Sequence, residues 1–422
     1  MSSSYRKQRA LVSNGALVAA ALCLAAVRAG AASWDLNPRL EVGGTVNDNL
    51  RLAETAADRV RVAGAAVDAQ LAMRSLTPRS ALTILPHVHS TYFPHDSADR
   101  STDGFLDLGG EYRTLKSVVG ATAQYADETV ISSELLPANF PGVSLGEIVG
   151  GTSGRVSVRN RRRLERVAPL FTHDFTPRRH LHLDAEYLNA SFDRNLLQQM
   201  GFRNAYGSAG LAFDLSPRAT FTVRGVASRF EPDGSRNTTA RYGIETQWNL
   251  RRSQIANLYL RLGADRTEAR SALGTLGSTG AVGGAGISWS YQITQFVLDA
   301  VRGLAPSAAG AVVVHDELRF RVLRALRPRL SGFVGVRAVR MRGAEQKAIP
   351  IQGSDYVAGS AGLELRITRN YRLSGTYDYT WQHFQGEPHA AANAVALSII
   401  YQPVSRFEPL PLSSGVGTER RE

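Results

Sequence analysis

The chain contains one cysteine, very little lysine and no long apolar run beyond its N-terminal segment. The cysteine, Cys23, lies in that segment, which we expect to be removed, so disulfides and thiol chemistry are excluded for the mature chain. Lysine occurs after the segment only at Lys116 and Lys347. No later window approaches about 18 consecutive apolar residues, which excludes a bundle of membrane-spanning helices. An exported soluble protein and a membrane barrel of β-strands remain.

The N-terminal segment has the pattern of a secretory signal peptide. Arg6, Lys7 and Arg9 precede an apolar stretch at residues 16–27, and small residues follow at 29–31. This stretch is shorter than the roughly 20 residues that a spanning helix needs, so an N-terminal membrane anchor is the weaker alternative. We expect residues 1–31 to be a signal peptide that is cleaved after export.

Positive charge comes almost entirely from arginine. The formal net charge of +12 becomes +8 when Arg6, Lys7, Arg9 and Arg28 of the signal peptide are subtracted. Arginine suits bidentate contacts with phosphate or carboxylate, although genome composition would produce the same bias. The partners expected of an exported protein of this charge are outer-membrane lipids, lipopolysaccharide and an anionic polysaccharide, and no nucleic acid.

Tight reversals recur along the chain, and three share one signature, at residues 76–79 (LTPR), 175–178 (FTPR) and 215–218 (LSPR). Between them run segments of about ten residues with apolar groups at every second position, which is typical of transmembrane β-barrels. The clearest segment, 371–381, places Leu373 and Tyr377 on one face and Asp378 on the other.

The pattern predicts an all-β fold, a transmembrane antiparallel up-and-down β-barrel of about 18 strands, with 16 to 20 possible. Barrels of this size can hold a water-filled lumen. The barrel would occupy residues 32–402, and residues 403–422, rich in Pro, Ser and charge, would form a disordered periplasmic tail. Because proline cannot donate to a strand ladder, we expect the strands around Pro86 and Pro169 to be shortened or bulged.

Loop lengths predict the orientation, since such barrels keep short turns in the periplasm and long loops outside. Residues 127–163 would then form the longest external loop. Two aromatic girdles are expected on the outer surface. The first lies beside the short turns and the second beside the long loops: Phe213, Phe221, Trp248, Trp289, Tyr291, Phe296, Tyr371 and Tyr401, and then Tyr92, Tyr125, Tyr187, Tyr242 and Trp381.

The densest run of arginines lies where the longest loop meets its descending strand, and it is a candidate contact for glycan or lipopolysaccharide. Its alternative is a solvated loop base that pairs with neighbouring acids such as Glu165. The run comprises Arg155, Arg159, Arg161, Arg162, Arg163 and Arg166.

A second set of charged residues falls on the predicted lumen faces and mixes both signs. Structural ion pairs across neighbouring strands are the favoured interpretation, and a solute-selecting constriction is the alternative. The set comprises Glu245, Arg261, Asp265, Glu317, Arg319, Arg321, Arg337, Glu364, Arg366, Arg372 and Asp378.

Other polar patterns give weaker signals. His87 with His89, and His180 with His182, have a spacing compatible with metal binding, but without carboxylates close in sequence ordinary lumen residues are favoured. The cluster at 47–49 (NDN) fits a turn better than a calcium site. No nucleotide, zinc-protease or serine-hydrolase motif appears, so we expect no metal, no cofactor and no catalytic residues.

With the strand order laid out, the sequence resembles the outer-membrane β-barrel proteins associated with the exosortase/PEP-CTERM system and exopolysaccharide loci, related to the β-barrel porin 2 group. The resemblance rests on the opening at 34–50 with its Asp48 and Asn49, on residues 107–136 with ETVISSE at 128–134, and on the arginines at 161–163. It implies location in the outer membrane of a Gram-negative bacterium and a role in assembling or exporting a surface polysaccharide. One departure is the tail after Tyr401, because many barrels end on a terminal aromatic that the barrel-assembly machinery recognises.

Three functions remain open at this stage. The first is a non-enzymatic barrel for exopolysaccharide biogenesis or export. The second is a general porin-like channel for small solutes. The third is an outer-membrane hydrolase, which would need a Ser/His/Asp cluster at the external rim.

Overall fold

A computed structural model shows one closed antiparallel β-barrel of 18 strands, which confirms the predicted fold class and strand number. It describes residues 33–94, 100–134, 160–194, 199–234, 237–253, 255–271, 274–344 and 352–403. The expected signal peptide, most of the expected tail, Arg155 and Arg159 lie outside these residues. The elements are β1 (Ser33–Asn47), β2 (Val62–Leu76), β3 (Ser80–Tyr92), β4 (Ser101–Arg113), β5 (Ser117–Thr129), α2 (Val130–Glu134), β6 (Arg161–Thr176), β7 (Arg179–Phe192), β8 (Phe202–Ser216), β9 (Ala219–Pro232), β10 (Thr238–Ser253), β11 (Ala256–Ser271), β12 (Gly274–Tyr291), β13 (Thr294–Ser307), β14 (Ala311–Arg327), β15 (Leu330–Gly343), β16 (Ser354–Arg366), β17 (Tyr371–Phe384) and β18 (His389–Tyr401).

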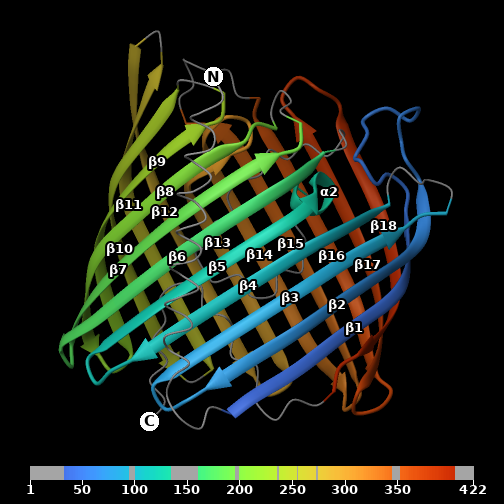
Figure 1. Ribbon diagram of the computed structural model, residues 1–422, viewed down its shortest axis with the longest axis horizontal. Coiled ribbons are helices and arrows are strands. Elements are labelled where there is room, and N and C mark those ends of the chain that lie inside the picture. Colours follow the sequence, from blue (N-terminus) through green and yellow to red (C-terminus); the bar gives the residue numbers. More distant parts are fainter. Residues whose placement is uncertain are drawn as a thin grey trace, which may run out of the picture.

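Each strand pairs with its neighbours in sequence, and the first pairs with the last. The β1–β18 ladder runs from Leu40 opposite Tyr401 to Asn47 opposite Ala394, which closes the sheet into a ring. The strands tilt steeply around the barrel, with short turns at its lower end and the longer connections at its upper end (Figure 1). No helix in the part of the chain that the structure describes is long and apolar enough to span a membrane.

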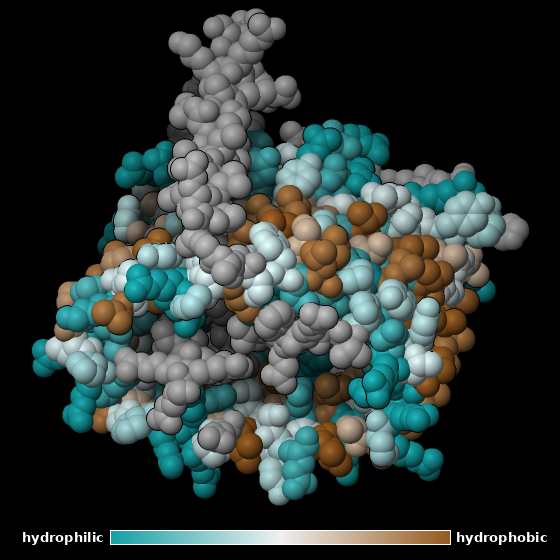
Figure 2. All heavy atoms as spheres, turned by 60° about the horizontal axis from the view of Figure 1, so that its bottom comes forward, coloured by the Kyte–Doolittle hydropathy of each residue, from teal (hydrophilic) through white to brown (hydrophobic). Residues whose placement is uncertain are grey.

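Strict alternation along the strands separates an apolar outer face from a polar inner face. On β10, Ile244 is 65% exposed while its neighbour Glu245 is 4% exposed, and the same period recurs around the ring. Hydrophobic side chains cover the flank of the barrel, and hydrophilic residues ring the end with the short turns (Figure 2). The outward-facing Trp248, Tyr291 and Tyr371 lie near that end, as expected for a girdle. The inner face therefore carries the polar groups of interest.

The prediction of shortened or bulged strands at Pro86 and Pro169 is wrong. Both β3 and β6 run through their proline without a register shift at it. Each proline stays paired on one side, Pro86 with Leu106 and Pro169 with Ala121. Only the ladder on the other side loses the pairs next to the proline. The long neighbouring ladders hold each strand straight despite the missing donor.

The β13–β14 hairpin departs from the barrel wall and reaches across the mouth of the lumen. The β12–β13 ladder stops at Gly283 opposite Arg302, although β12 continues to Gly274. Beyond that point, the tip of the hairpin meets the opposite wall, where Met200 N–H donates to Ala308 O at 2.8 Å. The apolar cluster formed there contains Leu188, Ala190, Phe202, Phe230, Ala308 and Val312.

Behind the hairpin, the wall closes over the gap that it leaves. Ser278 of β12 donates to the backbone oxygen of Ala344, just after β15, at 3.2 Å. The hairpin therefore narrows the upper mouth of the lumen without opening the side of the barrel.

Candidate functional site

The inner face of β10–β15 carries a ladder of ion pairs. Asp299 on β13 accepts hydrogen bonds from Tyr259 and Arg319. The guanidinium of Arg337 lies 2.8 Å from Glu317. Arg319 and Arg337 are 1% and 2% exposed, so both arginines are held against the wall by carboxylates on adjoining strands.

The ladder continues toward β9 through two further pairs. Arg224 contacts Glu245 at 2.5 Å, and Arg241 contacts Asp265 at 2.5 Å. Arg241 also reaches Glu245 at 3.2 Å. Cross-strand pairing, the favoured interpretation of the lumen charges, is therefore what the structure shows for these residues.

Glycines on neighbouring strands make room for these side chains to lie flat. A Cβ atom added to Gly286 would lie 2.5 Å from the ring of Tyr259, and one added to Gly263 would lie 2.8 Å from Glu245 Cγ. A Cβ atom added to Gly243 would collide with the carboxylate of Asp265. The glycines of β10–β12 thus keep the charged groups on the wall and out of the channel.

The remaining predicted lumen residues are paired less completely. Arg372 contacts Glu364 at 3.0 Å near the short turns, where Arg366 is exposed. Arg261 approaches Glu245 only to 4.0 Å. Arg321 and Asp378 have no ion-pair partner among the residues that the structure describes, and Arg321 Nε is buried without a hydrogen bond.

The ladders define which charged groups face the lumen, and the buried or half-buried ones divide unevenly around the ring. The arc β9–β15 carries six arginines and four carboxylates, a net +2: Arg224, Arg241, Arg261, Arg319, Arg321 and Arg337 against Glu245, Asp265, Asp299 and Glu317. The arc β16–β18 with β1–β8 carries five arginines and thirteen carboxylates, a net −8: Arg39, Arg74, Arg162, Arg166 and Arg372 against Asp35, Glu41, Asp68, Asp103, Asp107, Glu111, Glu128, Asp174, Asp184, Glu186, Asp214, Glu364 and Asp378. Of the carboxylates on the acidic arc, the sequence prediction named only Glu364 and Asp378 as lumen residues.

The predicted arginine run is split by the alternation of β6. Arg162 and Arg166 point inward, to Glu128 at 2.7 Å and Glu186 at 2.7 Å. Arg161 and Arg163 lie on the other side at the rim, and Arg161 contacts Asp127 at 2.8 Å. The described arginines therefore pair with acids of this chain, although not with the expected Glu165, and they do not form one surface.

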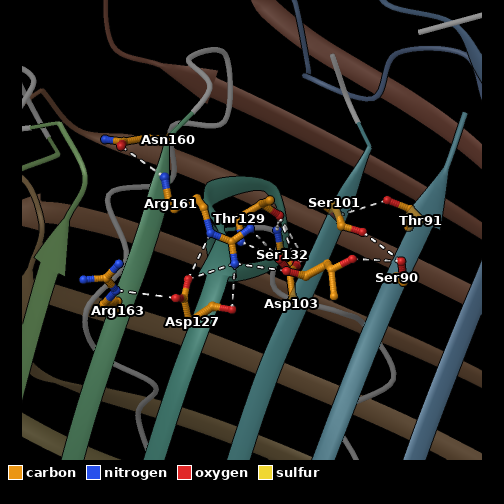
Figure 3. A network of polar contacts seen from close by, with 11 residues as sticks. Ser90, Thr91, Ser101, Asp103, Asp127, Thr129, Ser132, Asn160, Arg161 and Arg163 are labelled. Carbon is orange, nitrogen blue, oxygen red and sulfur yellow. Dashed lines mark hydrogen bonds and ion pairs between the residues drawn. The ribbon is translucent and has the colours of Figure 1, made fainter. Parts of the chain in front are cut away.

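Figure 3 shows the rim network that these residues join. The buried Asp103 of β4 accepts hydrogen bonds from the Thr129 backbone at 2.9 Å and from the Ser132 hydroxyl at 2.5 Å. Arg161 bridges from Asp127 toward Asp103. This network fixes the end of β5 and the short helix α2 against β4 and β6.

Three of the four histidines contact carboxylates on neighbouring strands, which spacing in the sequence could not reveal; His182 has no such contact among the described residues. His87 Nε2 lies 2.7 Å from Asp68 on β2, and His89 Nδ1 lies 3.4 Å from the same carboxylate. His180 is held between Asp174 at 2.6 Å and Asp214 at 3.0 Å. Among the described residues, no group of three or more His, Cys, Asp or Glu side chains has a geometry that could hold a metal ion.

No catalytic triad appears in the described rim network, which joins hydroxyls, carboxylates and arginines without a histidine (Figure 3). One Ser–His contact occurs elsewhere, between Ser117 Oγ and His173 Nδ1 at 2.8 Å, close to a short turn. No carboxylate of the described residues lies within bonding distance of His173. The Ser/His/Asp cluster expected of the hydrolase alternative is thus not found among the described residues of the rim.

The Asn47–Asn49 cluster forms a turn that locks the barrel seam. Asn47 Oδ1 accepts from the Asn49 backbone at 2.8 Å, and Asp48 accepts from the backbone and amide of Asn393, each at 2.7 Å. Partial burial would raise the pKa of Asp48, but the bonds from Asn393 and the nearby Arg59 and Arg61 hold it below its usual value. Its role is therefore structural, as the turn interpretation predicted.

Taken together, a closed antiparallel barrel with an apolar outer face and a charged inner face defines a transmembrane barrel of the outer-membrane type. No family model and no curated protein matches the sequence. Solved structures of outer-membrane channels resemble the fold. OccK2 of Pseudomonas aeruginosa, in complex with glucuronate, has a TM-score of 0.47 and 10% identity over 88% of this chain and 99% of that one. OpdK of the same organism, with vanillate, has 0.44 and 11% over 88% and 99%, and the FrpB iron transporter of Neisseria meningitidis has 0.44 and 8% over 87% and 81%.

Proposed function

We propose that this protein is a non-enzymatic, porin-like channel for small polar solutes in the outer membrane of a Gram-negative bacterium. The observation that carries the proposal is the inner face, which is lined by ionised side chains held flat over glycines. An 18-stranded barrel with its charged groups on the wall leaves space for water along its axis.

The position of the β13–β14 hairpin favours small solutes over polymers as the molecules that the channel passes. It crosses the upper mouth and docks on β7–β9 through a backbone hydrogen bond and an apolar cluster. A passage restricted in this way favours molecules that can pass beside a fixed obstacle, as in channels whose selectivity comes from a lined constriction.

Exopolysaccharide export, the first expectation from sequence, has less support. It rested partly on the arginine run, and the described members of that run are engaged with Asp127, Glu128 and Glu186. Three predictions accompany the outer-membrane assignment. They are contact with lipopolysaccharide, insertion by the barrel-assembly machinery and cleavage of the signal peptide.

Planar-bilayer recording tests the proposal. The purified mature protein, shown to be folded by the heat-dependent gel mobility of β-barrels, should give stepwise, stable conductance in KCl. Acidic exopolysaccharide fragments added to either side should leave the current unchanged. Silence from folded protein would refute the channel, and block by the fragments would restore the glycan role.

A further inference from the structure

The lumen carries an excess of negative charge on one side and of positive charge on the other. The arc β9–β15 has a net charge of +2 and the remaining arc a net −8, counting carboxylates and arginines that face inward and are at least half-buried. Most of these groups contact an oppositely charged side chain within their own arc. The field across the channel therefore depends on the groups that stay unneutralised.

Those groups lie on different arcs, and besides Asp378 on β17 they include two acids on the far side of the ring from β14. Asp107 on β4 and Asp184 on β7 have no ion-pair partner among the described residues; Asp184 accepts a hydrogen bond only from the neutral Ser208. Arg321 on β14 is likewise unpaired, and Arg261 on β11 reaches Glu245 only at 4.0 Å. The unpaired anions and cations are thus on different arcs.

Asp107 and Arg321 also lie at matching heights. In the closed ring of eighteen strands, β4 and β14 are separated by about half of the circumference. Asp107 is six residues from the lower end of its strand at Arg113, and Arg321 is six residues from the lower end of its strand at Arg327. All strands tilt around the barrel in the same sense (Figure 1), so equal residue counts from the lower end place both groups at one level, below the tip of the hairpin.

We propose that the channel selects small zwitterions, which it orients across the lumen with the ammonium group toward Asp107 and Asp184 and the carboxylate toward Arg321 and Arg261. This inference rests on the proposed channel function and names its solute class. A zwitterion aligned with a transverse field is stabilised at both of its charged ends at once. A solute without charged groups lacks this stabilisation. A low-dielectric wall focuses that field across the passage.

The test compares two isomeric solutes of equal mass, zwitterionic β-alanine and uncharged lactamide, in liposome-swelling assays at pH 7. Wild-type protein should pass β-alanine faster than lactamide. Asp107→Asn and Arg321→Gln should each lower that rate ratio by about twofold or more. The double variant has the net charge of the wild type, so it should lose the zwitterion preference while keeping the wild-type K⁺/Cl⁻ permeability ratio.

A matched control neutralises an ion pair outside the lumen. Arg340 and Asp355 contact each other at 2.6 Å on the outward face, and Arg340→Gln with Asp355→Asn should leave the rate ratio unchanged. If the Asp107 or Arg321 variants fail to fold, Asp184→Asn and Arg261→Gln repeat the exchange on the same two arcs.

The outcomes separate the two claims. Absence of conductance and swelling in folded wild-type protein would overturn the channel and the inference together. Normal conductance with an unchanged β-alanine to lactamide ratio in the double variant would overturn the zwitterion inference alone.

Discussion

At the residue scale, the stability of the barrel depends on large charged side chains that pack over glycines of the neighbouring strand. Asp265 lies over Gly243 and Glu245 over Gly263, so each charged group occupies space that a Cβ atom would fill. The same charged groups are neutralised by Arg241 and Arg224. Glycine in a strand interior is usually unfavourable, and here the ion pairs that it admits offset that cost.

Replacing Gly243 by alanine should therefore destabilise the barrel. The new Cβ atom would collide with Asp265 and lie 3.0 Å from Ala264 O, and overpacking of this kind costs about 1–3 kcal/mol. Gly280 is the matched control, because it faces the lumen opposite Asp265 with nothing within 4 Å, so Gly280→Ala should be neutral. Urea unfolding in lipid vesicles measures both, and equal midpoints would contradict the prediction.

Removal of a buried guanidinium should have a larger effect. Arg319→Met leaves Asp299 and Glu317 without one of their arginines, and an uncompensated buried carboxylate costs about 3–5 kcal/mol. Arg340→Met removes an exposed arginine that pairs with Asp355 and should change little. The same unfolding assay compares the two variants. Similar midpoints would show that the ion pairs of the inner face contribute no more to stability than the exposed pair does.

At the element scale, the β13–β14 hairpin distinguishes this barrel from a plain cylinder. Its tip is fixed by one backbone hydrogen bond to Met200 and by apolar packing against Phe202 and Phe230. Apolar side chains on an inner face would be unfavourable in contact with water, and the hairpin covers them. The docked position is therefore the resting state of the mouth.

Cysteines at Met200 and Ala308 should trap this docked hairpin. A backbone hydrogen bond of 2.8 Å joins the Met200 N–H to the Ala308 oxygen and places the two residues side by side, as a disulfide requires, and the mature chain is expected to lack other cysteines. Oxidation of M200C/A308C should cross-link the protein without changing single-channel conductance. The single variants M200C and A308C serve as controls. Failure to cross-link, or a conductance that rises on reduction, would mean that the hairpin moves away during conduction.

At the scale of the whole molecule, closure of the ring depends on the seam between β1 and β18. The turn after β1 reinforces that seam through the bonds from Asn393 to Asp48. The pKa of Asp48 is lower in the folded barrel than in the unfolded chain, where it is about 3.9. The contribution of Asp48 to stability is therefore fully present above the unfolded pKa, and it is lost as the pH falls through the lower folded pKa.

Asp48→Asn should therefore lower stability at neutral pH, by less than about 1 kcal/mol because the carboxylate is largely solvated. The difference from wild type should shrink as pH falls below about 4. Unfolding midpoints measured from pH 7 to pH 3 check this. A gap that stays constant, or widens in acid, would show that the Asp48 carboxylate does not stabilise the seam.

The sequence by itself determined the class of fold, because a period of two residues and alternating turn lengths require an antiparallel barrel whichever strand ends are chosen. It also placed residues such as Glu245 and Arg337 on the inner face, since parity within one strand is a local property. The tertiary structure alone decided which charges meet. Asp68 reaches His87, and Arg162 reaches Glu128, because partners are set by the register between strands. The inward hairpin and the opposition of Asp107 to Arg321 depend on ring closure, which brings together strands distant in sequence and leaves no periodic signal within any one of them.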